Sequence, residues 1–257
     1  MESLERLVRR FGPAAHWLAT LALYLLAASA LGLAIGAGLA FFSAWQSWLV
    51  PAAGAWRLPA TGLGCGLAFF VAGLALLLLV PAYNAVLPTR VRAYQGSYFS
   101  LASLPWCLHN GLFYLARYTF LPFVTLTPFG PWFLRAMGMR IGRRAFINTE
   151  LISDPCLIRI GDDVVVGGAV HLFAHYGGGG HLTIAPVEIG DRATIGLGAT
   201  VMGDVVIGAD AVLMPHSVLL PGSRVGAGET WGGVPARRLG ERTLERLRAA
   251  RRAGQPR

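Results

Sequence analysis

"IGDRATIGLGATVMGDVVIGADAVLMPHSVLLPGSRVGAGET", residues 189–230, repeats one pattern every six residues. Each hexad begins with an aliphatic residue, and the seven such positions are Ile189, Ile195, Val201, Ile207, Leu213, Leu219 and Val225. A small residue follows four positions later in five of the seven hexads, at Ala193, Ala199, Ala211, Ser217 and Ser223. Val205 and Glu229 are the two departures. A period of six matches neither the α-helix, with about 3.6 residues per turn, nor the strand, with a period of about 2.

Short repeats of this kind are typical of a parallel β-helix, in which each hexad makes one flat face and three faces close a coil. The aliphatic residue points into the prism, and the small residue fits where the chain turns a corner. Less regular hexads come earlier, "IGRRAF" at 141–146 and "IGDDVVVGGAVH" at 160–171. We therefore predict a β-helix over residues 137–236 and a basic C-terminal helix and tail over residues 237–257.

The N-terminal part of the chain is predicted to lie in a membrane. Mean hydropathy is +0.54 and only 14% of the residues are charged, which is unusual for a soluble domain. No charged residue lies between Arg10 and Arg57, nor between Arg57 and Arg90. Residues 1–92 are therefore predicted to form a transmembrane hairpin with spans at about 14–42 and 60–82. Two buried core helices of a soluble protein are the alternative.

The arginines around these two spans predict their orientation. Only Arg57 lies between the spans, whereas five arginines flank them on the other side: Arg6, Arg9, Arg10, Arg90 and Arg92. The positive-inside rule then places both termini and the β-helix in the cytoplasm, with the chain crossing the inner (cytoplasmic) membrane more than once. The first apolar run is too long for a signal-peptide core.

Residues 93–136 are predicted to be interfacial amphipathic helices and linkers at the cytoplasmic surface. They include the apolar segment 101–134, which is interrupted by Arg117 and four prolines: Pro105, Pro122, Pro128 and Pro131. A third span in this segment is the competing interpretation. It would place the C-terminal domain outside the cell, away from cytosolic thioesters.

Residues 132–236 resemble hexapeptide-repeat acyltransferases, whose β-helix is left-handed. They are most similar to the membrane-linked C-terminal units of nonribosomal peptide synthetases of the poly-lysine-synthetase type. The matching motifs are "LRAMGMRIG" at 134–142, "IGDDVVV" at 160–166, a histidine (His175) eleven residues before "PVEIG", Ser217, Gly222, and "GETWGGVPA" at 228–236. In that family, units of paired spans plus a repeat domain occur three times in one chain. The resemblance implies acyltransferase activity and a homotrimer.

The six-residue register fails in "HLFAHYGGGGHL", residues 171–182, and resumes at Ile189. We predict that "YGGGG" leaves the coil as a short loop. The resemblance assigns the role of general base to His175, with His171 as a substitute or partner, and His181 on the returning strand. A neutral imidazole takes a proton from a hydroxyl or amine that attacks a thioester, and a backbone N–H stabilises the oxyanion.

The residues of this stretch argue against two other functions, metal binding and phosphate binding. Its histidines are spaced H-x3-H-x5-H, but the glycines disrupt any helix and no cysteine or carboxylate lies close by, so we predict no metal site. A phosphate-binding loop needs a following Lys and Ser or Thr, which "GGGGHL" lacks. The remaining alternative is that the histidines only cap corners of the coil. Cys65, Cys107 and Cys156 are scattered and predict no disulfide.

The resemblance also implies where the donor thioester binds, in a groove between coils of adjacent subunits. The residues expected there are Gly198, Ala199, Ser217, Trp231, Gly233, Pro235 and Ala236. His216 stands where many acetyltransferases have glycine, which favours a carrier-bound or bulkier donor unless this histidine simply lies on the surface. No tightly bound cofactor is expected. Acyl-CoA or a carrier-protein phosphopantetheine thioester would act as co-substrate.

Three functions follow from the sequence. The first is a membrane-anchored acyltransferase that moves an acyl or aminoacyl group from a thioester to a hydroxyl or amine. The second is a peptide-bond-forming unit that acts with a separate adenylation–carrier protein. The third is a catalytically silent scaffold. The expected partners are two further copies of the chain, membrane lipid, and an acidic carrier protein or a lipid-linked acceptor. The basic helix favours anionic partners of that kind, and nothing in the sequence favours nucleic acid.

Overall fold

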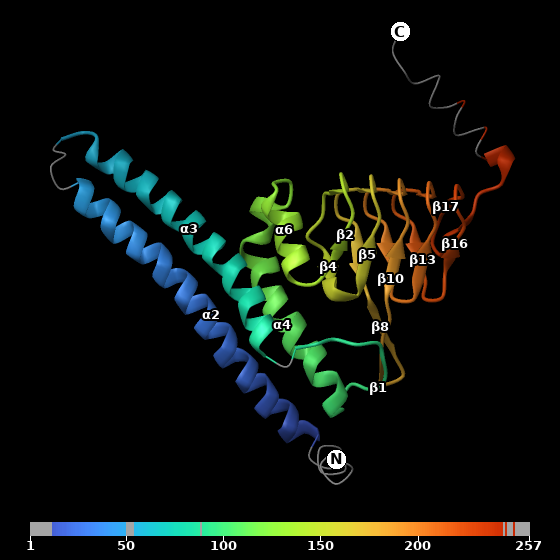
Figure 1. The fold of residues 1–257 in the computed structure, drawn as a ribbon, viewed down its shortest axis with the longest axis horizontal. Helices are drawn as coiled ribbons and strands as arrows, with labels where there is room; N and C mark the ends of the chain where they lie inside the picture. The colour runs from blue at the N-terminus through green and yellow to red at the C-terminus, as the bar shows by residue number, and fades with distance from the viewer. Residues whose placement is uncertain (1–11, 50–53, 88, 244, 246–248, 250–257) are drawn as a thin grey trace. The chain divides into compact units, whose positions relative to one another are not determined.

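The computed structural model describes residues 12–49, 54–87, 89–243, 245 and 249. The chain folds into two compact units (Figure 1). The helical unit comprises Met1–Gly138 and Gly177–Leu182, and the prism unit comprises Met139–Tyr176 and Thr183–Arg257. The predicted fold class is confirmed: two long apolar helices, shorter helices, a parallel β-helix and a C-terminal helical segment follow one another along the chain.

The two long helices are α2 (Gly12–Leu49) and α3 (Arg57–Val86), which pack along each other as a hairpin (Figure 1). Small residues permit the close approach, because a Cβ at Gly38 would lie 2.7 Å from the carbonyl oxygen of Ala68. At Gly64 the indole of Trp45 occupies the space, and its Nε1 donates to the carbonyl of Ala60 at 2.9 Å.

Both long helices are apolar on their outward faces. Thr20–Leu49 and Arg57–Val86 are long and apolar enough to cross a membrane, and only 17% and 28% of their most apolar windows are buried. A core helix of a soluble protein is mostly buried, whereas these two segments are not. The helices include the predicted spans at about 14–42 and 60–82 and extend beyond them.

Shorter elements complete the helical unit: β1 (Tyr94–Ser97), the 3-10 helix η1 (Leu101–Ser103), α4 (Leu104–Thr119), α5 (Leu121–Val124) and α6 (Phe129–Ala136). Among the described residues only α2 and α3 meet the length and hydropathy of a span, because the prolines divide 101–134 into short helices. That residues 93–136 lie at the membrane interface stays a prediction. Strand β1 was not predicted.

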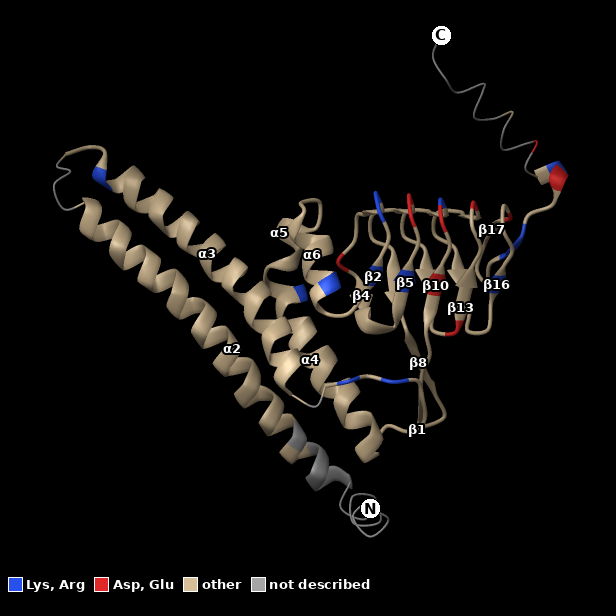
Figure 2. Cartoon of the chain, viewed as in Figure 1, with Lys and Arg blue, Asp and Glu red and all other residues tan. Residues whose placement is uncertain are grey.

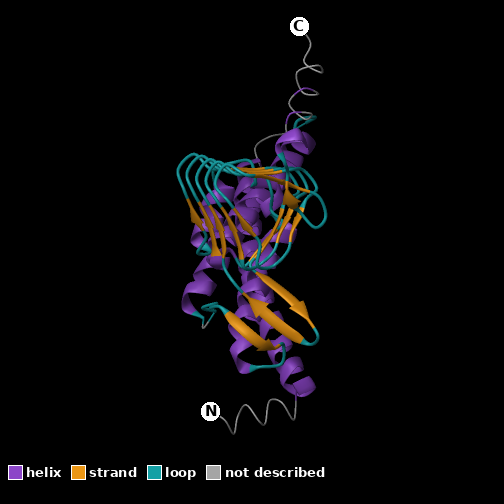
Figure 3. Cartoon of the chain, turned by 90° about the vertical axis from the view of Figure 1, so that its right-hand side faces the viewer, coloured by secondary structure: helices purple, strands orange, loops and turns teal. Residues whose placement is uncertain are grey.

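Three parallel sheets form the prism and stack coil upon coil (Figure 3). Face 1 contains β2 (Arg140–Ile141), β5 (Ile158–Ile160), β10 (Val187–Ile189), β13 (Val205–Ile207) and β16 (Arg224–Val225). Face 2 contains β3 (Phe146–Ile147), β6 (Val165–Val166), β11 (Thr194–Ile195), β14 (Val212–Leu213) and β17 (Thr230–Gly232). Face 3 contains β4 (Ile152–Ser153), β7 (His171–Phe173), β12 (Thr200–Val201) and β15 (Val218–Leu219).

The hexad pattern predicts the interior correctly. All seven aliphatic positions are buried, none more than 4% exposed. Val205, a departure from the small-residue rule, is 0% exposed and fills the corner between faces 3 and 1. Ala193, Ala199 and Ala211 are likewise fully buried at corners.

The corner between faces 1 and 2 carries a column of charges on left-handed backbone. Arg144, Asp163, Arg192 and Asp210 have φ of 53°, 57°, 57° and 59° in successive coils. Their guanidinium and carboxylate groups pair between coils, Arg144 with Asp163 and Arg192 with Asp210, each at 2.7 Å. Figure 2 shows that charged residues gather on the prism, whereas α2 and α3 carry almost none.

The last coil ends differently from the prediction of a helix over 237–257. Arg237–Arg238 form β18, antiparallel to β17, with Trp231 opposite Arg238. The described helical residues begin at 241. The strand precedes the helix because it pairs with the otherwise open edge of β17. Most of the basic segment lies outside the described residues.

Candidate active site

The prism brings Asp154 and His175 together at the ends of neighbouring strands. Ser153 of β4 is in register with Phe173 of β7, so the residues that follow both strands emerge at the corner between faces 3 and 1. Asp154 has left-handed backbone (φ 57°) and opens the 3-10 helix η2 (Pro155–Leu157). Its Oδ2 lies 2.6 Å from Nδ1 of His175. The side-chain exposure is 22% for the histidine and 0% for the aspartate.

This contact determines which imidazole nitrogen can act as a base. An ionised carboxylate only accepts hydrogen bonds, so the Nδ1 of a neutral His175 carries the proton that Asp154 accepts. Its Nε2 then keeps the lone pair that abstracts a proton. Burial strengthens the charge-assisted bond and holds the ring in one orientation. Such an arrangement is able to orient a general base.

An aromatic row extends from His175 along the outer face of β7. The ring of Phe173 lies 6.0 Å from that of His175 and 5.5 Å from that of His171, centroid to centroid. Leu172 between them points into the prism and is 0% exposed. The ring contacts thus join each histidine to Phe173, and only His175 has the buried carboxylate beside it in the described structure.

The glycine run forms a hairpin rather than an irregular loop. Strands β8 (His175–Gly178) and β9 (His181–Ile184) join β1 in a three-stranded sheet of order β1-β9-β8. Gly179 and Gly180, with φ of 56° and 80°, make the two-residue turn, a conformation that suits glycine. His181 lies on the returning strand as predicted; it is exposed, with Nδ1 3.1 Å from the carbonyl of Gly179.

Gly177 is required for a different reason. A Cβ built on it would lie 1.7 Å from the hydroxyl oxygen of Tyr98, within the same helical unit. At Gly178, the next residue, a Cβ would meet nothing within 4 Å. The glycines therefore serve the geometry of the hairpin. Within the described residues no group of three or more His, Cys, Asp or Glu side chains is placed to hold a metal.

Asp154 and His175 form a dyad, and Cys156 lies near it, two residues after Asp154. Burial, together with the negative charge of Asp154, raises the pKa of its thiol to about 12. A thiol with so high a pKa stays protonated near neutrality and is a poor nucleophile. His175 therefore has no nucleophilic thiolate beside it at Cys156.

The predicted donor residues lie at another corner, between faces 2 and 3. Gly198 has a φ of 65°, and a Cβ there would lie 2.6 Å from Nδ1 of His216 in the next coil. His216 itself has a φ of 56°. Gly233 donates its N–H to Oγ of Ser217 at 3.2 Å. The imidazole of His216 thus covers Gly198, at the place where the resemblance implies a bound thioester.

Of the remaining predicted donor residues, Ala199 lies in a middle coil, and Trp231, Pro235 and Ala236 lie at the end of the prism. Ala199 and Ala236 are buried, at 0% and 2% exposure. Trp231 occupies the aliphatic position of the last hexad, and its Nε1 donates to Glu229 at 2.8 Å. Pro235 lies in the closing segment, where the N–H of Ala236 donates to the carbonyl of Val218. None of these residues meets His175 within one prism.

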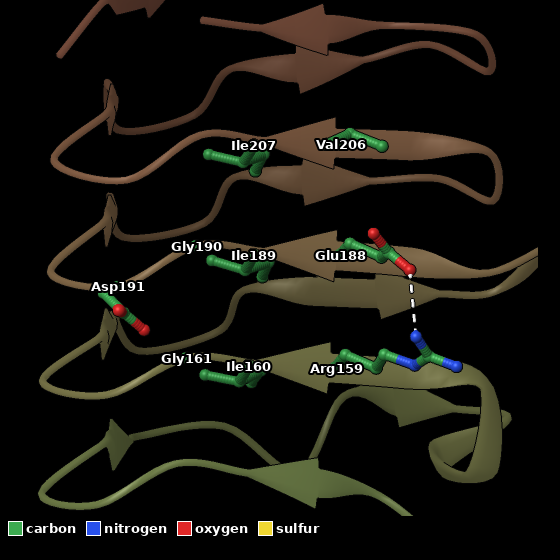
Figure 4. A pocket seen from close by; sticks show the side chains of 9 residues that line it. All are labelled: Arg159, Ile160, Gly161, Glu188, Ile189, Gly190, Asp191, Val206 and Ile207. Carbon is green, nitrogen blue, oxygen red and sulfur yellow. Dashed lines mark hydrogen bonds and ion pairs between the residues drawn. The ribbon is translucent and has the colours of Figure 1, made fainter. Parts of the chain in front are cut away.

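A separate depression lies on the outer side of face 1 (Figure 4). It measures about 330 Å³ and includes the ion pair between Arg159 and Glu188, whose charged atoms lie 3.4 Å apart. Its floor is formed by Ile160, Ile189 and Ile207. It contains no histidine, and its carboxylates, Glu188 and Asp191, are not fully buried as Asp154 is.

Comparison with known proteins finds partial similarities and no matching family model. A delta-poly-L-ornithine synthetase from Acinetobacter baumannii (strain AB307-0294) is 28% identical over 121 residues, which cover 46% of this chain and 9% of that protein. The chain therefore matches less than a tenth of the length of this curated relative.

Similar solved structures are hexapeptide-repeat acetyltransferases. A maltose O-acetyltransferase from Clostridium difficile 630 has 21% identity and a TM-score of 0.40, covering 46% of this chain and 81% of its own. An acetyltransferase from Vibrio cholerae O1 biovar eltor, solved with acetyl coenzyme A, has 22% identity and a TM-score of 0.42, covering 49% and 85%. The matched proteins are of the two kinds that the sequence resembles, namely acetyltransferases of the hexapeptide-repeat type and a poly-ornithine synthetase.

Proposed function

We propose that the protein is a membrane-anchored acyltransferase in which His175 is the general base. The observation that carries this proposal is the 2.6 Å contact between His175 and the fully buried Asp154. A scaffold has no need of a buried carboxylate aimed at a partly exposed imidazole, since burying a charge is costly. The dyad also lies beside the only interruption of the hexad register after residue 160.

The proposed reaction transfers an acyl group from sulfur to oxygen or nitrogen. Nε2 of His175 removes a proton from the acceptor hydroxyl or amine as that atom attacks the thioester carbonyl. The tetrahedral intermediate collapses with loss of the thiolate, which takes the proton from the imidazolium. Asp154 stabilises the imidazolium in between and keeps its own charge. A backbone N–H beside the hairpin would stabilise the oxyanion.

A complete site requires more than one prism in this proposal. His175 lies at the corner between faces 3 and 1, whereas Gly198, His216 and Ser217 lie at the corner between faces 2 and 3. Two different corners of one prism do not form one site. A homotrimer in which one prism supplies the base and its neighbour supplies the donor groove resolves this, as the resemblance implies. Crosslinking in mild detergent should give trimers, and monomers alone would contradict it.

Membrane anchoring is supported by the exposed apolar surface of α2 and α3. We propose that both cross the inner membrane and that the prism is cytoplasmic, where acyl-CoA and acyl carriers occur. Arg90 and Arg92 support this orientation, and Arg6, Arg9 and Arg10, which complete the argument, lie outside the described residues.

A second candidate function is peptide-bond formation on an aminoacyl carrier thioester. The similarity to a poly-ornithine synthetase favours it, and the same base would deprotonate an acceptor amine. A bulky imidazole at His216 over Gly198 also suits a carrier-bound donor. The experiment below identifies the acceptor and distinguishes coenzyme A from a carrier protein as the source of the acyl group.

The test measures thiol release by the purified detergent-solubilised protein from acetyl-CoA or from an aminoacyl carrier, with lipid and saccharide extracts as acceptors. His175→Ala should lower the rate by about 10²–10⁴-fold. His181→Ala is the matched control in the same hairpin and should leave the rate unchanged, since His181 is exposed and bonds only locally. Equal rates for the wild type and His175→Ala would reject the proposal.

A further inference from the structure

Helix α6 is apolar on two faces. Its inward face buries Gly130, Phe133 and Leu134 within the helical unit. Its outward face presents Phe129 and Trp132, which are 49% and 44% exposed. Such a helix leaves part of its apolar surface uncovered by its own chain. The outward aromatic side chains therefore flank a space that the protein itself leaves open.

That space is a cavity of about 300 Å³ between α3 and α6. Five side chains line it: Leu74, Leu77, Leu78, Phe129 and Trp132. Leu77 is 1% exposed and lies deepest, and Leu78 is 60% exposed. The volume is at the lower end of the roughly 300–1,000 Å³ of small-molecule sites. Apart from one indole N–H, the lining offers no polar group, so it suits a hydrocarbon segment rather than a sugar or nucleotide.

A positive charge lies at the end of the same helical face. Arg135 is three residues after Trp132 and six after Phe129, which places all three on one side of α6. Arg135 is exposed. An apolar cavity followed by a guanidinium matches a molecule with an alkyl chain and an anionic head, because arginine attracts anionic lipid near the membrane surface.

We propose that the cavity between α3 and α6 binds one acyl chain of an anionic phospholipid, with the lipid phosphate at Arg135. The proposal rests on the membrane placement in the proposed function and is independent of the transfer chemistry. A site of this kind differs from the general lipid annulus in two ways: it saturates, and it selects the headgroup.

The test uses phosphatidylglycerol with a diazirine in one acyl chain, added to the full-length protein in nanodiscs of unlabelled phosphatidylcholine. After irradiation, mass spectrometry should locate saturable labelling at Leu74–Leu78 and Phe129–Trp132. Leu74→Trp fills the cavity and should lower labelling by roughly tenfold. Leu63→Trp is the matched control, because Leu63 lies on the same helix, is 57% exposed and does not line the cavity.

Two further variants keep the test decisive. Leu78→Ala removes one exposed wall without introducing bulk, so it should fold normally and weaken labelling. Arg135→Gln should lower the phosphatidylglycerol labelling roughly fivefold and leave labelling by the phosphatidylcholine analogue unchanged. Uniform, non-saturating labelling along α3 in every variant would overturn the proposal. His175→Ala should label like the wild type, so loss of transfer and loss of lipid binding are distinguishable.

Discussion

Two corners of the prism each join an aspartate to a basic side chain of a neighbouring coil, and they differ in their access to water. At the corner between faces 1 and 2, Arg192 and Asp210 pair with side-chain exposures of 57% and 53%. At the corner between faces 3 and 1, His175 and Asp154 pair with exposures of 22% and 0%. Both aspartates have left-handed backbone, with φ of 59° and 57°. The same local device therefore occurs in two different environments.

At the exposed corner the charged side chains pair in contact with water. Hydrogen bonds from Arg192, then its charge, hold the pKa of Asp210 below its usual range. The Arg143 backbone N–H, followed by its guanidinium, does the same for the pKa of Asp162. Such pairs are screened by water and contribute little individually. At the buried corner the carboxylate of Asp154 is out of contact with water, so its hydrogen bond to the imidazole is screened less.

The largest expected effect is that of Asp154→Asn on transfer. An amide can present its N–H to Nδ1 of His175 and so stabilise the wrong tautomer, which moves the proton to Nε2. We expect kcat to fall by about 10²–10⁴-fold, with KM for the thioester little changed. Stopped-flow thiol release at saturating donor measures this.

The matched control for Asp154→Asn is Asp210→Asn, at the exposed corner. It should leave kcat at the wild-type value, because the carboxylate of Asp210 accepts its hydrogen bonds from the exposed Arg192. Circular dichroism should show the same β-helix content in both variants. A normal kcat in Asp154→Asn would remove the distinction between the two corners.

A smaller effect is expected from Gly177→Ala, in the strand that begins at His175. The new Cβ would meet the hydroxyl of Tyr98, and such overpacking costs roughly 1–3 kcal/mol. We expect a lower Tm and a lower kcat, because β8 shifts as a unit. Thermal unfolding followed by circular dichroism, with parallel transfer assays, measures both.

Two variants separate the steric cause from a general loss of glycine. Gly178→Ala adds the same methyl group where nothing lies within 4 Å, so it should behave like the wild type. Tyr98→Phe removes the atom nearest to the new Cβ and should partly restore Gly177→Ala. If Gly178→Ala is as damaging as Gly177→Ala, the contact with Tyr98 is not the cause.

The exposed corner should respond only weakly to substitution. Arg192→Ala removes its pair with Asp210 and should lower Tm by about 3 °C or less, with transfer unchanged. Differential scanning calorimetry of the detergent-solubilised protein measures the shift. A loss of transfer comparable with that of Asp154→Asn would mean that the two corners do not differ as described.

The smallest expected effect is a dependence of stability on acid. The carboxyl groups of Asp162, Asp163, Asp210 and Glu229 have pKa values below their usual range, chiefly through hydrogen bonds. Their contribution is complete above the unfolded pKa, roughly 4, and is lost as the pH falls through the lower folded values. Tm should therefore be level from neutral pH to about 5 and decline below about 4. A Tm that rises on acidification would contradict this sign.

The sequence predicts the prism well because its period is carried by the side chains themselves. Ile189 to Val225 bury as the hexads require, and the interruption at 171–182 marks the hairpin. Asp154 was not predicted from the sequence. Because Ile152 pairs with Leu172, residues about one coil before His175 lie beside it. A search for carboxylates at that spacing finds Asp154.

The hairpin itself was predicted only as a loop. Its strands pair with β1, which lies some eighty residues earlier, and no local pattern encodes a partner at that distance. The role of Gly177 depends in the same way on Tyr98. The donor residues came from resemblance alone, and the structure locates Ala199 and Ala236 in the packed interior. Long-range pairing and burial, rather than composition, decide these features.

A double-mutant cycle tests the central claim most directly, that His175 and Asp154 act as one base. Thiol release would be compared in the wild type, His175→Ala, Asp154→Asn and the combined variant. If Asp154 acts through the imidazole, the combined variant will be no slower than His175→Ala alone. Independent losses that multiply in the combined variant, or a wild-type rate in His175→Ala, would contradict the account.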